Sequence, residues 1–183
     1  MNMQVLAILV VVAVAAAAIL LWVYAAKRQS TQLRERFGPE YDAAVSKMGD
    51  RRRAEADLKA RAQRVEQLHI RRLERDEAER FAERWRSVQA LFVDDPRGAV
   101  AHANSLVKEV MQARGYPMGD FDQRAADISV DHPHVVENYR AAREIALRSD
   151  GGAASTDELR TAFVHYRALF EELLEAPELV EVH

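Results

Sequence analysis

The densest group of potential metal ligands in the chain is Asp131-His132-Pro133-His134, with Glu137 one helical turn further on. Two imidazoles and a carboxylate are ligand types that hold zinc or iron. The same residues also fit an ordinary helix start, with an acidic side chain near the helix N-terminus and a proline in the first turn. Because Pro133 directs the two rings along paths that do not obviously converge, we predict no metal here. A metal-dependent enzyme or sensor built on Asp131 to Glu137 is the alternative.

A second candidate is the pair Glu66 and His69, a Glu-x-x-His spacing of the kind that di-iron helical bundles use. Such a centre needs a second pair and two further glutamates facing it, and the sequence contains no second Glu-x-x-His. Gly-rich phosphate loops, Gly-x-Ser-x-Gly and His-Glu-x-x-His are also absent, and the chain has no cysteine. We therefore predict no catalytic, cofactor-binding or metal-binding residues, and a protein that is not an enzyme.

Aromatic residues at helical spacing are interpreted as hydrophobic core rather than as a ligand pocket. They are Phe81, Trp85, Tyr139, Phe163, Tyr166 and Phe170. His165 lies roughly 120° round the helix from this stripe, at about 100° per residue, and is expected on the flank or in solvent.

Charge is distributed unevenly along the chain. Residues 27–80 hold 15 Lys and Arg against 11 Asp and Glu, whereas residues 81–183 hold 11 against 18, a net charge of −7. An acidic region of this kind argues against nucleic-acid binding, which needs clustered positive charge to displace counterions from phosphates. The run Arg51 to Arg53 is diluted by neighbouring acidic residues, and we interpret it as a solvated helix face rather than a lipid-binding patch.

An unbroken run of 22 uncharged, mostly aliphatic residues occupies positions 5–26. As a helix it spans about 33 Å, which matches a hydrocarbon core of about 30 Å. Trp22 and Tyr24 lie at its downstream end, and basic residues follow only on that side, from Lys27 onwards. Its length and uncharged N-terminal flank argue against a cleavable signal peptide. We predict a single-pass anchor in the cell inner membrane, with the N-terminus outside, the soluble region in the cytoplasm and residues 5–36 in contact with lipid.

Apolar periodicity, caps and helix breakers predict an all-α chain. Helices are expected to begin at or near Pro39, Arg51, Arg75, Pro96, Phe121, Pro133 and Ser155. The predicted organisation is an anchor over 1–26, a basic juxtamembrane segment and charged helical stalk over 27–74, a three- or four-helix bundle over 75–176, and a tail over 177–183.

The stalk helix, from about Arg51 to His69, has only a thin apolar stripe. The stripe consists of Ala54, Leu58, Val65 and Leu68, and Arg61 interrupts it. One interpretation is an exposed spacer partly laid on the bundle. The other is a coiled-coil seam through which two copies of the chain associate.

Five sequence blocks, taken together, resemble a set found in uncharacterised bacterial proteins that have one N-terminal membrane helix. The blocks are Arg36-Phe-Gly-Pro-Glu-Tyr-Asp42, Phe92-Val-Asp-Asp-Pro96, Arg114-Gly-Tyr-Pro117, Arg124-Ala-Ala-Asp-Ile-Ser-Val-Asp-His-Pro133 and Val164-His-Tyr-Arg167. The resemblance covers about residues 27–175 and implies a bacterial, membrane-anchored helical protein, with no activity to carry over. From the residues themselves we expect a membrane-anchored interaction or scaffold module whose acidic outer faces meet a protein partner.

Overall fold

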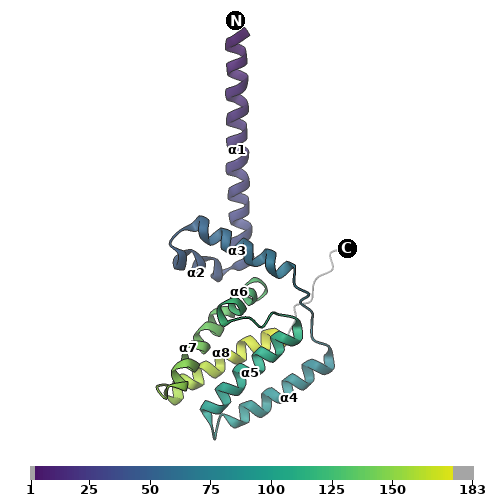
Figure 1. Cartoon of the computed structure of the whole chain (residues 1–183), viewed down its shortest axis with the longest axis vertical. Helices are drawn as coiled ribbons and strands as arrows, with labels where there is room; N and C mark the ends of the chain where they lie inside the picture. Colours follow the sequence, from purple (N-terminus) through teal and green to yellow (C-terminus); the bar gives the residue numbers. More distant parts are fainter. Residues whose placement is uncertain (1–2, 175–183) are drawn as a thin grey trace.

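The computed structural model describes the backbone of residues 3–174 and the side chains of residues 12–25 and 27–174. This part of the chain forms eight α-helices and no β-strand, which confirms the predicted all-α class. One long helix projects from a globular arrangement of shorter ones (Figure 1). The predicted tail over 177–183 lies outside the described residues.

The projecting helix, α1, runs without a break over Met3–Phe37. Its 35 residues correspond to a length of about 52 Å. The described side chains from Val12 to Tyr24 are exposed, although most of them are apolar. Within the described residues α1 is the one helix that is long and apolar enough to cross a membrane. The helix does not stop where the apolar run stops, at residue 26, but continues into the globular region.

Two helices fold back against the end of α1. They are α2, over Pro39–Met48, and α3, over Arg51–Glu66. The chain turns from α1 into α2 at Gly38, whose φ of 45° lies in the left-handed region that side-chain-bearing residues rarely adopt. Asp50 caps α3 as its sequence position predicted, because its carboxylate accepts hydrogen bonds from backbone N–H groups of the first turn.

A small hydrophobic core holds these three helices together. Its buried members are Leu33, Phe37, Tyr41, Ala44, Ala54, Leu58, Ala62, Val65 and Val130. Three residues of the stripe, Ala54, Leu58 and Val65, are therefore buried against helices of the same chain, which is more burial than an exposed spacer would have. Association of two copies of the chain through this segment stays a prediction. A thin stripe is enough to hold α3 in place because α1 extends past the apolar run and α2 folds back against it. Each of the three helices then supplies a small part of one shared core. We call residues 27–66 the α1–α3 unit.

The remaining helices form the distal bundle, which packs around a larger core. They are α4 (Arg75–Leu91), α5 (Pro96–Arg114), α6 (Phe121–Asp131), α7 (Val136–Asp150) and α8 (Thr156–Leu174). Helix α8 packs against both α5 and α7, α4 packs on α5, and α6 contacts α7 on one side and α3 on the other. Helix α6 therefore connects the distal bundle with the α1–α3 unit (Figure 1).

The predicted helix ends agree with the structure at most positions. Asp95 caps α5 by accepting a hydrogen bond from the Gly98 N–H at 2.9 Å. Ser155 and Glu158 form the expected capping box at the start of α8. The exception is α7, which begins at Val136 instead of Pro133, because the intervening residues form a turn after α6.

The aromatic set forms part of the distal core, as predicted. Trp85 stacks on Phe170 with ring centroids 4.5 Å apart and contacts Phe163 at 5.1 Å. Tyr139 and Tyr166 are fully buried. These rings fill the space between α4, α7 and α8, so they pack against each other instead of lining a ligand pocket.

Candidate functional site

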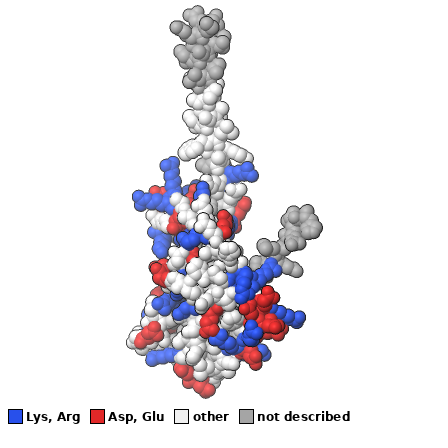
Figure 2. All heavy atoms as spheres, turned by 45° about the vertical axis from the view of Figure 1, so that its right-hand side comes forward, with Lys and Arg blue, Asp and Glu red and all other residues white. Residues whose placement is uncertain are grey.

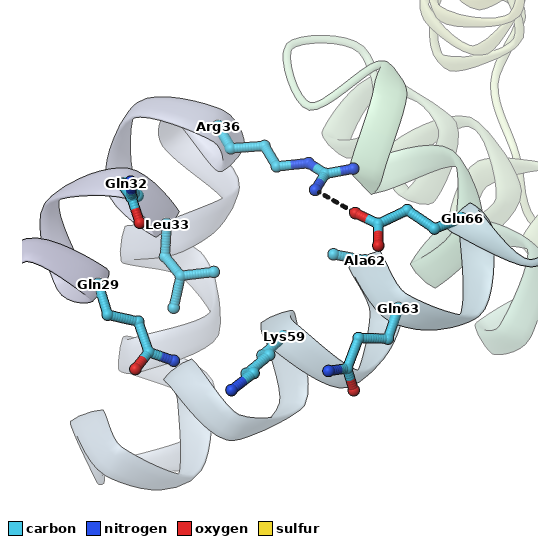
Figure 3. Close-up of a pocket in the computed structure, with 8 residues that line it drawn as sticks. All are labelled: Gln29, Gln32, Leu33, Arg36, Lys59, Ala62, Gln63 and Glu66. Atoms are coloured by element: carbon cyan, nitrogen blue, oxygen red, sulfur yellow. Dashed lines mark hydrogen bonds and ion pairs between the residues drawn. The ribbon is translucent and has the colours of Figure 1, made fainter. Parts of the chain in front are cut away.

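A groove of about 460 Å³ lies between the last turns of α1 and α3 (Figure 3). It is lined by Gln29, Gln32, Leu33, Arg36, Lys59, Ala62, Gln63 and Glu66. Leu33 and Ala62 are buried and form its apolar floor, whereas the other lining residues are polar. The methyl side chain of Ala62 leaves a gap between the two helices that a longer side chain would fill.

The two ends of the groove differ in charge. At one end, the Arg36 guanidinium donates to the Glu66 carboxylate at 2.9 Å, so that an ion pair crosses the gap (Figure 3). At the other end, Gln29, Lys59 and Gln63 present two amides and one ammonium (Figure 3). The Lys59 ammonium has no hydrogen bond or ion pair with any described residue. The groove therefore has one neutralised end and one positively charged end.

The positively charged end is the end nearer the apolar part of α1. Along a helix with a rise of about 1.5 Å per residue, Gln29 lies about 4.5 Å beyond residue 26 and Arg36 about 15 Å beyond it. The groove thus runs away from the apolar segment, and its unpaired ammonium is close to the boundary between apolar and charged surface.

A polar cluster holds the start of α3 against α1 at the same level. Arg51 donates to the Ser30 hydroxyl and, at 2.8 Å, to the Glu55 carboxylate. Tyr41 donates to the same carboxylate at 2.7 Å. Burial by itself raises the pKa of Glu55, but the hydrogen bonds from Arg51 and Tyr41 outweigh it and hold the pKa below its usual value. The contact with Ser30 places the Arg51 guanidinium only about one helical turn beyond residue 26.

Unpaired charges in the α1–α3 unit are mostly positive. Its basic side chains without an ion pair to a described residue are Lys27, Arg28, Lys47, Arg52 and Lys59, and its single such acidic side chain is Glu35. Figure 2 shows Lys and Arg side chains gathered where the uncharged surface of α1 meets the globular region.

A buried ion network joins the α1–α3 unit to the distal bundle. The Glu40 side chain is 3% exposed and accepts hydrogen bonds from Arg61 at 2.8 Å and from Arg140 at 2.7 and 2.8 Å. Burial alone raises the pKa of Glu40, but the hydrogen bonds and positive charges of Arg140 and Arg61 outweigh it, so the pKa is lowered. Glu40 is therefore ionised at neutral pH, and it connects α2 with α3 and α7.

A second buried carboxylate connects α3 with α6. The fully buried Asp127 accepts a hydrogen bond of 2.8 Å from the Arg64 Nε–H, and a second guanidinium nitrogen of Arg64 lies 2.8 Å from the same carboxylate oxygen in an ion pair. Gln123 donates to both oxygens of the same carboxylate at 2.9 and 3.1 Å. The contact between Arg140 and Glu40 is bidentate and therefore geometrically specific. Together, the Glu40 and Asp127 contacts fix the orientation of the distal bundle relative to the end of α1.

The residues considered as metal ligands are directed to separate partners. Asp131 accepts a hydrogen bond from the Tyr116 hydroxyl at 3.0 Å, and Glu137 pairs with Arg140 at 3.3 Å. The exposed His134 lies beside the turn at Gly38. Within the described residues no three His, Asp or Glu side chains are grouped as metal ligands would be.

His132 is buried in a structural polar cluster. Its Nε2 lies 3.3 Å from the Arg114 guanidinium and its Nδ1 lies 3.1 Å from a Glu172 carboxylate oxygen. Because Arg114 can only donate, Nε2 is assigned as acceptor and Nδ1–H as donor. Burial lowers the pKa of His132, although Glu172 acts in the opposite direction. Arg114 also donates to the Leu173 carbonyl at 3.1 Å, so the cluster ties α5 and α6 to the end of α8.

Glu66 and His69 lie in different surroundings. Glu66 is the last residue of α3 and bonds to Arg36, whereas His69 lies beyond the helix end and is exposed. Neither the groove nor the Glu40 network was predicted from the sequence. One signal was present in Arg61, which interrupts the apolar stripe of α3 and proves to be a partner of the buried Glu40.

Comparison of the sequence and the structure with protein families, curated proteins and solved structures found no match.

Proposed function

We propose that this chain is a single-pass protein of a bacterial inner membrane, in which α1 is the membrane anchor and the helical region is a scaffold or interaction module in the cytoplasm. The observation that carries the proposal is the continuity of α1. The apolar helix continues without a break to Phe37, and its last turns contribute Leu33 and Phe37 to a folded core. Motion of the anchor is thereby coupled directly to the domain, because no flexible linker separates them.

The two buried carboxylates support a scaffold role. Glu40 and Asp127 connect the α1–α3 unit to α6 and α7, so the distal bundle is held at one orientation to α1. A module fixed in this way presents the same outer faces to the cytoplasm in every copy. The net charge of −7 over residues 81–183 favours a partner with a basic surface, since complementary charge accelerates and orients association.

The membrane topology is tested with reporter fusions at the C-terminus. A fluorescent protein fused there should be fluorescent and alkaline phosphatase fused there should be inactive, because the basic residues lie only on the C-terminal flank of the apolar run. Replacing Lys27 and Arg28 by glutamine weakens that flank and should raise phosphatase activity. An active phosphatase fusion to the unmodified chain would reverse the proposed topology.

The partner is tested with photo-crosslinking residues in the native membrane, placed at the exposed distal positions Asp94 and Asp150. A discrete protein adduct is expected. Reversing the charge of Asp122, another exposed acid of the distal bundle, should weaken the adduct, whereas reversing that of Arg72 in the segment before α4 should not. If both distal positions label only lipid or give no discrete adduct, the interaction role is wrong even if the topology is right.

A further inference from the structure

We propose that the groove between α1 and α3 binds the phosphate of an anionic phospholipid, with Lys59 as the charged contact and the amides of Gln29 and Gln63 as hydrogen-bond donors. The inference rests on the proposed insertion of α1, and it assigns a lipid-recognition site to a region outside the anchor itself.

The depth of the groove matches the headgroup layer. A bilayer of about 40–45 Å with a hydrocarbon core of about 30 Å leaves about 5–7.5 Å for the headgroups on each side. Trp22 and Tyr24 precede the first basic residues, so the hydrocarbon core of the membrane should end near residue 26. Gln29 lies about 4.5 Å further along the helix and is therefore inside the headgroup layer. The Lys59 side chain extends from α3 towards that level (Figure 3). A headgroup can therefore reach the positively charged end of the groove without leaving the membrane.

The chemistry of the positively charged end fits a phosphate. An ammonium supplies up to three donors and each amide two, which suits an oxyanion with several acceptor oxygens. No carboxylate lines this end, because Glu66 lies at the opposite end and is neutralised by Arg36. The apolar floor formed by Leu33 and Ala62 can contact the glycerol and first methylene groups of the lipid.

The surroundings favour an anionic lipid over a zwitterionic one. The α1–α3 unit carries five unpaired basic side chains against one unpaired acid. Arg52 directly follows Arg51, whose guanidinium the contact with Ser30 holds close to the end of the apolar run. A zwitterionic headgroup would bring its own cation into this positive field, whereas an anionic headgroup gains from every nearby basic residue.

The test measures lipids retained by the full-length protein in a mild detergent, using native mass spectrometry. Phosphatidylglycerol and phosphatidylcholine are titrated separately, and inorganic phosphate is added as a free-anion competitor. The unmodified chain should retain phosphatidylglycerol in preference. Lys59→Gln should weaken that retention about fivefold, the ratio corresponding to one basic residue near an anionic surface. Gln63→Leu should weaken it without a change in net charge.

Arg86→Gln is the matched control, because Arg86 is an exposed, unpaired cation on the distant α4. Equal effects of Lys59→Gln and Arg86→Gln would reduce the finding to general charge attraction and overturn the site. Displacement of the lipid by inorganic phosphate at the same concentration would instead identify a site for a soluble phosphate and overturn the lipid assignment.

Carbonate extraction of membranes separates the groove proposal from the proposed membrane insertion. A chain that stays in the membrane yet lacks lipid preference contradicts only the groove. A released chain contradicts membrane insertion itself.

Discussion

Replacing Glu40 by glutamine removes the one negative charge shared by Arg61 and Arg140 and should weaken the connection between the α1–α3 unit and the distal bundle. Removing one partner of a buried ion pair typically costs about 3–5 kcal/mol, because the other charge stays buried without compensation. Here the Arg140 side chain is 31% exposed and keeps Glu137, and Arg61 keeps Asp57 at 2.6 Å. Solvent and these remaining partners reduce the expected cost to about 2–3 kcal/mol.

The measurement is urea unfolding of the full-length chain in detergent at pH 7, followed by circular dichroism. With a slope of about 1.5–2 kcal/mol per molar urea, Glu40→Gln should lower the unfolding midpoint by more than about 1 M. Glu137→Gln is the control, because it removes a carboxylate that contacts the same arginine but is 74% exposed. That change should cost less than about 1 kcal/mol. Equal midpoints for the two variants would refute the assignment of Glu40 as the buried link.

The lowered pKa of Glu40 predicts that the stability of the fold depends on pH. Since folding lowers the pKa of Glu40 from its usual 4.5, the folded state binds this proton less readily than the unfolded state does. The stabilisation is therefore complete above about pH 5 and is lost as the pH falls through the lowered, folded-state pKa. Glu40→Gln should lose less stability than the unmodified chain between pH 5 and the acid limit of the folded state, and identical acid profiles would contradict this linkage.

Three further predictions concern the distal bundle. Phe163→Ala should cost about 3–5 kcal/mol of stability, because this buried ring packs between Trp85 and other aromatic residues. His165 is only partly buried, so His165→Ala should change the urea unfolding midpoint little. Similar midpoints for the two variants would show that the buried face of α8 is wrongly assigned. Tyr166→Phe should be neutral or stabilising by up to about 1 kcal/mol, since the buried hydroxyl has no hydrogen-bond partner among the described residues, and a loss of stability would reveal a partner. Purified protein should contain no stoichiometric metal by elemental analysis, and a metal that disappears when His132 is replaced by alanine would overturn the structural role of that ring.

The local elements were predictable because their signals are local. Asp50 and Asp95 cap helices as expected, and the Gly115 at the end of α5 adopts the left-handed conformation that helix ends favour. The stripe containing Phe163 and Phe170 lies in the core because a period of 3.6 residues already defines the buried face. Each of these features depends on neighbours within one or two helical turns.

The sequence by itself therefore determined an all-α chain with one long apolar helix, a basic segment beside it and an acidic distal half. Only the tertiary structure decided how the thin stripe of α3 is buried and which charges become partners. Glu40 and Arg140 are 100 positions apart in sequence, and Arg64 and Asp127 are 63 apart. Pairing over such separations depends on how whole helices pack, and hydrophobic periodicity carries no information about it. The groove has the same origin, because its two walls come from α1 and α3, and the gap between them exists only once α2 has folded α3 back against α1.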